Sequence, residues 1–134
     1  MEHFVLVADD DQSVLDRART VIGQEGYIAV TAHDGKEAYK ALRTHISIVA
    51  AFIDLEMPYI QGIEIVKFMK TDERLRSVPA IVMDDNANAE LLQRALAAGA
   101  IGSIQKPFND VRFRSVLHTF ASSSANPESD RAAS

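Results

Sequence analysis

Apolar runs alternate along this chain with stretches in which apolar residues recur every third or fourth position. The runs occupy residues 4–8, 27–32, 48–53, 79–83 and 101–104. The run that ends before Asp54 lacks the apolar–polar alternation of a strand with one face in water, and it predicts a strand buried on both faces, as in parallel sheets. Because an ionised side chain does not belong inside such a strand, we expect Asp54 where the chain leaves the core.

Helical spacing fills the intervals between these runs. The apolar faces of the predicted helices are Val14, Leu15, Ala18, Val21 and Ile22; Ala38, Ala41 and Leu42; Ile63, Val66, Phe68 and Met69; Leu91, Leu92, Ala95 and Leu96; and Phe113, Val116, Leu117 and Phe120. Residues 70–77 are polar and are predicted to form a surface connection. Strands that alternate with helices in this way predict an α/β fold with a parallel sheet.

Polar residues at the helix starts predict how each helix is capped. The expected caps are Asp11 or Gln12, Asp34, Asn86 or Asn88, and Asn109, with Asp110 as a further capping carboxylate. Asp34 and Glu37 have the spacing of a capping box. Gly26 and Gly99 lie where the first and fourth helices should end.

Five strands and five helices in alternation fit a flavodoxin-like, doubly wound five-stranded parallel sheet with strand order 2-1-3-4-5. In that order the first and third strands are neighbours, so Asp9 and Asp10 should lie beside Asp54 at the carboxyl ends of the strands. The fourth and fifth strands should bring Asp84 and Lys106 to the same edge. Open α/β sheets bind their ligands at this edge.

Composition narrows the possible functions. The chain has 134 residues, 47% of them hydrophobic, which suffices for one globular domain, expected at residues 1–121. The absence of cysteine excludes thiol catalysis, and a net charge of −5 argues against a nucleic-acid partner. No signal peptide or membrane span is evident, so we expect a cytoplasmic protein without a membrane partner. Residues 122–134 are expected to be a disordered tail or the start of a linker.

The predicted cluster of carboxylates has a chemical meaning. At an effective dielectric constant of about 20, two unit charges about 4 Å apart repel by roughly 4 kcal/mol. Mg²⁺ would relieve this repulsion, because it binds one or two carboxylates, keeps several waters and accepts a phosphate oxygen. Lys106 would add a second positive charge. The site therefore favours phosphate chemistry, with Asp54 as a carboxylate nucleophile that forms an acyl phosphate.

Four short motifs follow one another along the chain: residues 5–11 (VLVADDD), residues 53–58 (IDLEMP) followed by Gly62, residues 98–100 (AGA) and residues 106–108 (KPF). In this order and spacing they resemble the receiver domain of bacterial two-component response regulators, and the chain is close in size to the single-domain chemotaxis-type receivers. The resemblance covers residues 3–121.

The resemblance implies a role for each site residue. Asp54 is expected to be the phosphoacceptor, and Lys106 the lysine that contacts the phosphate. Asp9 and Asp10 would hold Mg²⁺ together with Asp54 and the backbone carbonyl of Glu56. The Lys106–Pro107 peptide bond would be cis. The phosphodonor would be a phosphohistidine on a sensor histidine kinase or a histidine phosphotransfer protein, and the output would pass by contact to an unknown protein target.

Two positions depart from the receiver pattern. Receivers carry Ser or Thr at the end of the fourth strand, where this chain has Asp84. The aromatic switch residue of the fifth strand is replaced by Ser103. Asp84 would add negative charge beside a phosphoryl group and could draw Lys106 into an ion pair, and both effects oppose a stable phosphorylated state.

Two alternatives follow from these departures and from the Asp54 motif. The chain could be a pseudo-receiver, an interaction module that signals without phosphorylation. It could also be a small phosphohydrolase with an aspartate nucleophile, although the sequence has no evident cap domain or substrate pocket. As a receiver it would not be an enzyme beyond catalysing its own phosphorylation and dephosphorylation.

Overall fold

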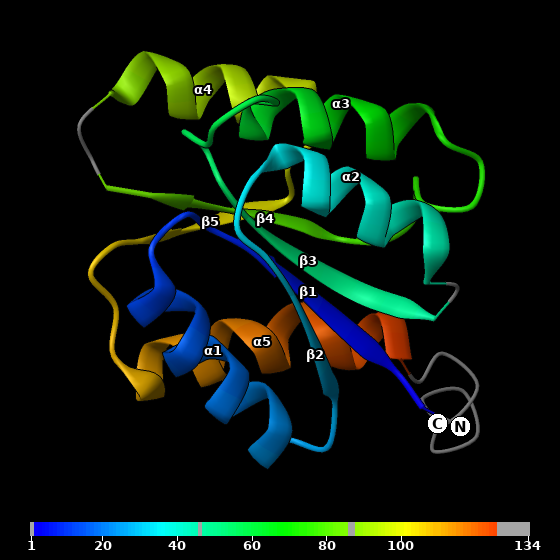
Figure 1. The fold of residues 1–134 in the computed structure, drawn as a ribbon, viewed down its shortest axis with the longest axis vertical. Coiled ribbons are helices and arrows are strands. Elements are labelled where there is room, and N and C mark those ends of the chain that lie inside the picture. The colour runs from blue at the N-terminus through cyan, green and yellow to red at the C-terminus, as the bar shows by residue number, and fades with distance from the viewer. Residues whose placement is uncertain (1, 46, 86–87, 126–134) are drawn as a thin grey trace.

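The computed structural model describes residues 2–45, 47–85 and 88–125. Its strands are β1 (Phe4–Ala8), β2 (Ile28–Ala32), β3 (Ile48–Asp54), β4 (Ala80–Asp84) and β5 (Gly102–Gln105), and its helices are α1 (Gln12–Gln24), α2 (Gly35–Thr44), α3 (Gly62–Thr71), α4 (Ala89–Ala98) and α5 (Asp110–Ala125). All strand pairs are parallel and the sheet order is β2-β1-β3-β4-β5 (Figure 1). The predicted fold is confirmed.

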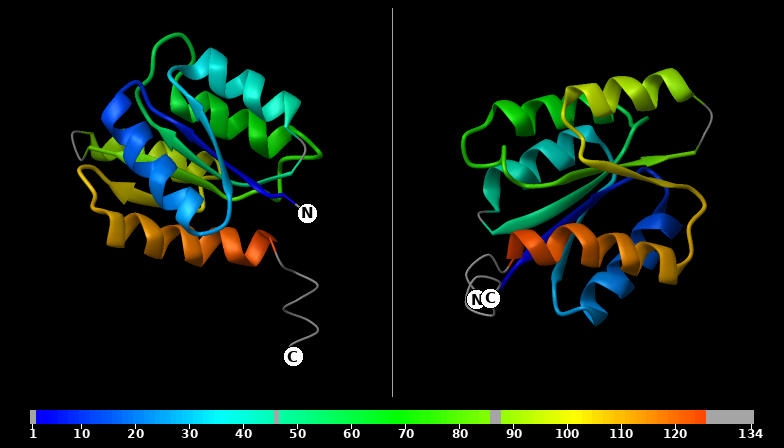
Figure 2. Two further views of the ribbon diagram at one scale, coloured as in Figure 1. Left: turned by 60° about the horizontal axis from the view of Figure 1, so that its bottom comes forward. Right: turned by 180° about the vertical axis from the view of Figure 1, so that it is seen from behind.

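The sheet lies between two layers of helices. α1 and α5 cover one face, and α2, α3 and α4 cover the other (Figures 1 and 2). Each face has its own apolar cluster, one that includes Leu6, Ile53 and Ile65 and one that includes Phe52 and Phe113. All seven residues of β3 are buried, because this strand has neighbours on both edges and helices on both faces. That burial explains the unbroken apolar run before Asp54.

Most of the predicted caps are present. The carboxylate of Asp11 accepts a hydrogen bond from the Ser13 N–H at 2.9 Å, and the Asn88 side chain accepts one from the Leu91 N–H at 3.0 Å. Asn86, the other candidate for α4, lies outside the described residues. Asp34 accepts from the Glu37 N–H at 2.8 Å, as the capping box predicts.

Two details of the capping predictions are wrong. The Glu37 carboxylate accepts from the His33 N–H at 2.7 Å instead of returning to Asp34. Asp110 lies in the first turn of α5 and does not cap it, because Asn109 accepts the hydrogen bond from the Arg112 N–H at 2.8 Å.

Several boundaries differ from the sequence prediction. β4 and β5 each begin and end one residue later than expected, so Asp84 is the last residue of β4 instead of following it. The predicted surface connection at residues 70–77 is partly core, since α3 continues to Thr71 and Leu75 is buried. α5 extends to Ala125, four residues past the boundary expected at 121. In the described part of the chain, no helix is long and apolar enough to cross a membrane.

Candidate functional site

Three carboxylates meet at the carboxyl ends of β1 and β3. Asp9 and Asp10 follow β1, and Asp54 ends β3. One carboxylate oxygen from each of the three lies within 4.8 Å of the others. Asp9 and Asp54 are buried, whereas Asp10 is exposed. The sheet order thus creates the predicted cluster, because β1 and β3 are neighbours.

Lys106 reaches this cluster from the end of β5. Its Nζ lies 2.9 Å from Asp9 Oδ2 and 3.4 Å from Asp54 Oδ1. Its backbone N–H donates to the Asp84 carbonyl at 2.6 Å, and the following peptide bond to Pro107 is cis, as the resemblance predicted. Burial alone would lower the pKa of Lys106, but its hydrogen bond to Asp9 and the charges of Asp54 and Asp9 outweigh burial and raise that pKa. Lys106 is therefore a fixed positive charge between two carboxylates.

Asp54 holds its proton more tightly than an ordinary carboxyl group. Burial, followed by the charge of Asp9, raises its pKa from 3.8 to about 7. The opposing contributions of Lys106 and of the Glu56 N–H, which donates to Asp54 Oδ1 at 3.4 Å, only partly offset this rise. Negative charge at Asp54 is thus under-compensated by the protein alone.

The loop between β3 and α3 is held tightly against Asp54. The Gly62 N–H donates to the Leu55 carbonyl at 3.1 Å, and a Cβ at Gly62 would lie 2.1 Å from the Asp54 carbonyl oxygen. The Gly35 N–H donates to the Pro58 carbonyl at 3.2 Å, which ties the start of α2 to the same loop. A Cβ at Gly35 would lie 2.1 Å from the Ile60 carbonyl oxygen, so both Gly35 and Gly62 allow a close approach to this loop that a side chain would block.

Asp84 lines a cavity of about 280 Å³ next to the carboxylate cluster. Asp10, Asp54, Glu56 and Lys106 also line it. The ion pair that Asp84 could have formed with Lys106 is absent from the described residues, where Lys106 Nζ lies within ion-pair distance of Asp9 and Asp54. Asp84 contacts Lys106 through its backbone carbonyl instead.

Ser103 lies on β5 in register with Val82 and is half-buried. It takes the strand position at which the resemblance places an aromatic side chain. The backbone N–H of Glu56 donates a hydrogen bond to Asp54 Oδ1. The metal-binding role expected for the Glu56 carbonyl stays a prediction.

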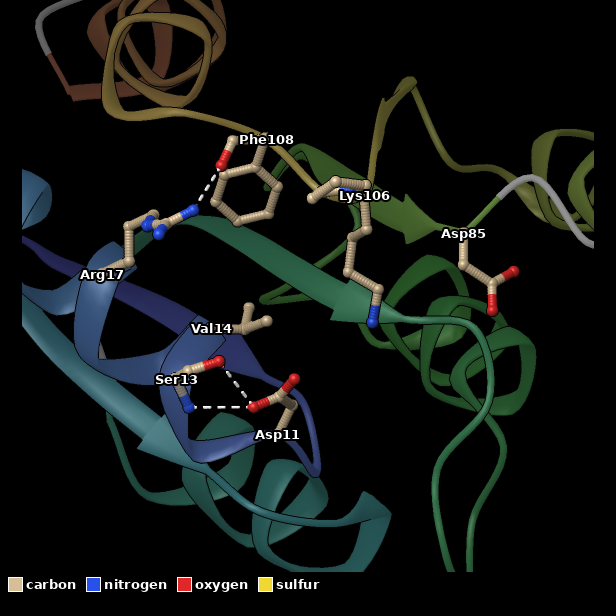
Figure 3. Close-up of a pocket in the computed structure, with 8 residues that line it drawn as sticks. Asp11, Ser13, Val14, Arg17, Asp85, Lys106 and Phe108 are labelled. Atoms are coloured by element: carbon tan, nitrogen blue, oxygen red, sulfur yellow. Dashed lines mark hydrogen bonds between the residues drawn. The ribbon is translucent and has the colours of Figure 1, made fainter.

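A second cavity of about 490 Å³ lies on the other side of Lys106, between the first turn of α1 and the loop that follows β5 (Figure 3). Asp11, Ser13, Arg17 and Phe108 are among its lining residues. Arg17 donates to the Phe108 carbonyl at 2.7 Å and so joins two segments 91 residues apart in sequence. The sequence prediction missed this cavity, because Arg17 belongs to no motif and its partner is a backbone atom.

The carboxylate cluster fits a hard divalent cation. Two ligand oxygens on opposite sides of Mg²⁺ are about 4.2 Å apart, since Mg–O distances are about 2.1 Å. The three aspartate oxygens span a similar distance, and all are of the hard oxygen type that Mg²⁺ prefers. Burial first and the charge of Asp9 second raise the pKa of Asp54, and a cation at this site would favour its ionised form against both.

The chain belongs to the response regulator receiver domain family, whose sequence pattern it matches over residues 5–118. It is therefore a receiver domain of two-component signalling, a class of signalling proteins. It is 33% identical over 105 residues to the response regulator SaeR of Staphylococcus aureus and 28% identical over 109 residues to the response regulator GtcR of Aneurinibacillus migulanus. These matches cover 78% and 81% of this chain but only 44% and 43% of the two relatives, so the chain spans less than half of their length.

Solved structures agree with this assignment. The chemotaxis response regulator CheY4 of Vibrio cholerae superposes with a TM-score of 0.82 at 27% identity, covering 90% of this chain and 99% of CheY4. The receiver domain of the Pseudomonas aeruginosa sensor histidine kinase PA1611, which has a magnesium ion coordinated in its active-site cleft, superposes with a TM-score of 0.80. At 20% identity and with coverage of 91% of this chain and 99% of that domain, it supports the fold alone.

Proposed function

We propose that this receiver accepts a phosphoryl group on Asp54 from a phosphohistidine, with Mg²⁺ bound by Asp9, Asp10 and Asp54. The observation that carries the proposal is the convergence of three carboxylates within 4.8 Å, next to a lysine that pairs with two of them. Four isolated helix caps or surface charges would not converge in this way at the edge of one sheet.

The contacts of Asp54 indicate which of its atoms reacts. Oδ1 accepts from the Glu56 N–H and lies 3.4 Å from Lys106 Nζ, so it is already engaged. Within the described residues no hydrogen bond involves Oδ2, which leaves its lone pairs available. In the proposed step Oδ2 attacks the phosphorus atom, the phosphorus–nitrogen bond breaks, and the imidazole nitrogen keeps the electron pair.

The neighbouring groups would stabilise the charge that moves in this step. Lys106 would donate a hydrogen bond to a phosphoryl oxygen on Asp54 while it keeps its hydrogen bond to Asp9. When bound, Mg²⁺ would supply positive charge that keeps Asp54 ionised and shields the phosphoryl oxygens. Asp10 is exposed, so the cluster is open to a cation and to a donor from solvent.

The partners in this proposal are a sensor histidine kinase or a histidine phosphotransfer protein as donor and a protein target as recipient of the signal. Family membership supports the first, because receivers act with histidine kinases. The cytoplasmic location expected from the sequence stays a prediction.

Phosphorylation by a small donor tests the proposal. The chain is incubated with Mg²⁺ and acetyl phosphate, or with beryllofluoride as a phosphoryl analogue, and examined by intact-mass and fluorescence or NMR measurements. We expect an adduct or a spectral change that requires Mg²⁺ and disappears in Asp54→Ala. A correctly folded protein that responds to neither reagent at saturation would contradict the proposal and favour the pseudo-receiver alternative.

A further inference from the structure

Asp84 is a buried carboxylate, and none of the cationic side chains in the described part of the chain forms an ion pair with it. Its exposed fraction is 8%, and within the described residues its side chain takes part in no hydrogen bond or ion pair. Among those same residues, His3 Nδ1 is the one side-chain polar atom that is both unpartnered and sealed from solvent. The Asp84 oxygens are therefore open to the cavity of about 280 Å³ that they line together with Asp54.

Hydrogen-bond chemistry limits what Asp84 can do beside a phosphoryl group on Asp54. An ionised carboxylate has acceptors only, and phosphoryl oxygens are also acceptors, so the two cannot bond directly. A hydroxyl group, which can donate, would bond to the phosphoryl oxygen instead. Water is the natural bridge, because the cavity has room for several molecules at about 30 Å³ each. Such a water donates one hydrogen to Asp84 and presents its oxygen to the phosphoryl group.

We propose that Asp84 shortens the life of the phosphoryl group on Asp54 by holding and deprotonating the water that hydrolyses it. This inference rests on the proposed function. The water oxygen forms a bond to phosphorus, the bond between phosphorus and Asp54 Oδ2 breaks, and Asp54 recovers its carboxylate. The water proton passes to Asp84 and from there to orthophosphate or solvent. Asp84 would thus act as a general base in a receiver that returns quickly to its unphosphorylated state.

Electrostatics acts in the same direction. The Lys106 side chain forms ion pairs with Asp9 and Asp54. In the described part of the chain it forms none with Asp84, so it does not neutralise the charge of Asp84. A phosphoryl group carries a charge of about −1.5 to −2 near neutral pH, and Asp84 adds a further negative charge in the same cavity. Loss of orthophosphate relieves this repulsion.

The test measures phosphoryl lifetime in matched variants of the whole chain. Wild type, Asp84→Asn, Asp84→Thr, Asp85→Asn and Asp54→Ala are treated with Mg²⁺ and acetyl phosphate. Intact mass gives the phosphorylated fraction and its decay after the donor is removed, and orthophosphate release gives the turnover. Asp84→Asn keeps the side-chain shape without the base, and Asp84→Thr supplies a donating hydroxyl. Asp85→Asn is the control, because Asp85 lines the same cavity and the substitution removes the same charge.

We expect both Asp84 variants to lengthen the lifetime at least about tenfold, since general-base catalysis is typically worth 10²–10⁴-fold, and Asp85→Asn to change it less than about threefold. Decay in D₂O should slow more in wild type than in Asp84→Asn, which a purely structural role would not produce. Equal lifetimes with Asp54-dependent phosphorylation in all proteins would overturn the inference and leave the proposed function intact. If no protein shows an adduct or Asp54-dependent orthophosphate release, both are overturned.

Discussion

The two halves of the site differ in how far they keep the receiver pattern. The β1–β3 half has the buried carboxylates of Asp9 and Asp54, the exposed carboxylate of Asp10 and a tightly packed loop, and Lys106 reaches it from the end of β5. The β4–β5 half has Asp84 and Ser103 at the positions where the resemblance to receivers places a hydroxyl residue and an aromatic residue. Under the proposed function the β1–β3 half, with Lys106, would be the accepting half and the β4–β5 half the reporting half, so that neighbouring strands of one sheet would carry two separable roles. Four predictions test this separation.

Loss of Lys106 should be the most damaging change to the accepting half. Lys106→Ala leaves the fully buried Asp9 carboxylate without its cation, and breaking such a pair costs about 2–4 kcal/mol of unfolding free energy after allowance for the partial exposure of Lys106. Urea unfolding in EDTA measures this cost. Lys67→Ala is the control, because Lys67 pairs with Glu64 at the surface and should cost less than about 0.5 kcal/mol. Equal losses of unfolding free energy in the two variants would show that the buried pair of Lys106 and Asp9 contributes no more to stability than the surface pair of Lys67 and Glu64.

Adding a single methyl group should distinguish the two halves. At Gly62 the new Cβ would lie 2.1 Å from the Asp54 carbonyl oxygen. Because that oxygen belongs to the backbone, the clash can be relieved only if the loop between β3 and α3 moves. We expect Gly62→Ala to lower the free energy of unfolding by about 2–3 kcal/mol and to impair phosphorylation. At Gly102 on β5 the nearest atom is the far end of the Phe120 ring at 3.0 Å, so Gly102→Ala should cost about 1 kcal/mol or less.

Thermal unfolding of the two glycine variants measures the difference. Gly23→Ala serves as a control, because its added Cβ would meet no atom within 4 Å other than neighbouring parts of its own helix, and alanine favours a helix. A Gly62→Ala protein as stable as Gly102→Ala would mean that the loop holding Asp54 is not closely packed.

The pH dependence of stability should report the cost of ionising the buried carboxyl group of Asp54 beside Asp9. Its pKa is about 7 in the fold and 3.8 in its ordinary state, so the folded chain binds the proton more tightly. The resulting stability is present below about pH 4 and is lost as the pH rises through about 7. Without divalent cations, Asp54→Asn should therefore be more stable than wild type by about 1–2 kcal/mol at pH 8, and this advantage should shrink towards pH 5. Urea titrations at the two pH values measure it, and an advantage independent of pH would contradict the assignment.

The smallest effect is expected in the reporting half. Ser103→Ala removes a half-buried hydroxyl from β5 and should change the free energy of unfolding by less than about 0.5 kcal/mol. It should also leave the decay of phospho-Asp54 unchanged. Differential scanning calorimetry and the mass assay measure the two quantities. A tenfold change in decay would show that Ser103 communicates with Asp54.

The sequence was sufficient for the fold and for the members of the carboxylate cluster. Apolar periodicity distinguished strands from helices, and strand order then placed Asp9 beside Asp54. It was not sufficient for the partners of Lys106, because the choice between Asp9 and Asp84 depends on the direction of a long side chain from the end of β5. The burial of Leu75 was missed for a related reason, since a single apolar residue in a polar stretch gives no periodic signal.

Side-chain contacts between distant segments also could not be predicted from the sequence. Arg17 meets a backbone carbonyl at Phe108, and every residue offers such a carbonyl, so no residue type identifies the partner. The sequence came nearer to predicting the cap of α5. Asn109 and Asp110 are adjacent candidates, and a shift of one residue decides between them.

The most direct test of the central claim is to locate the phosphoryl group at residue level. Wild-type protein at steady state with Mg²⁺ and acetyl phosphate is treated with borohydride, which reduces an aspartyl phosphate to homoserine, and its peptides are analysed by mass spectrometry. The account predicts homoserine at position 54, and none in the absence of Mg²⁺ or at Asp85. Homoserine at another aspartate, or none at position 54 in a folded protein that turns over the donor, would contradict it.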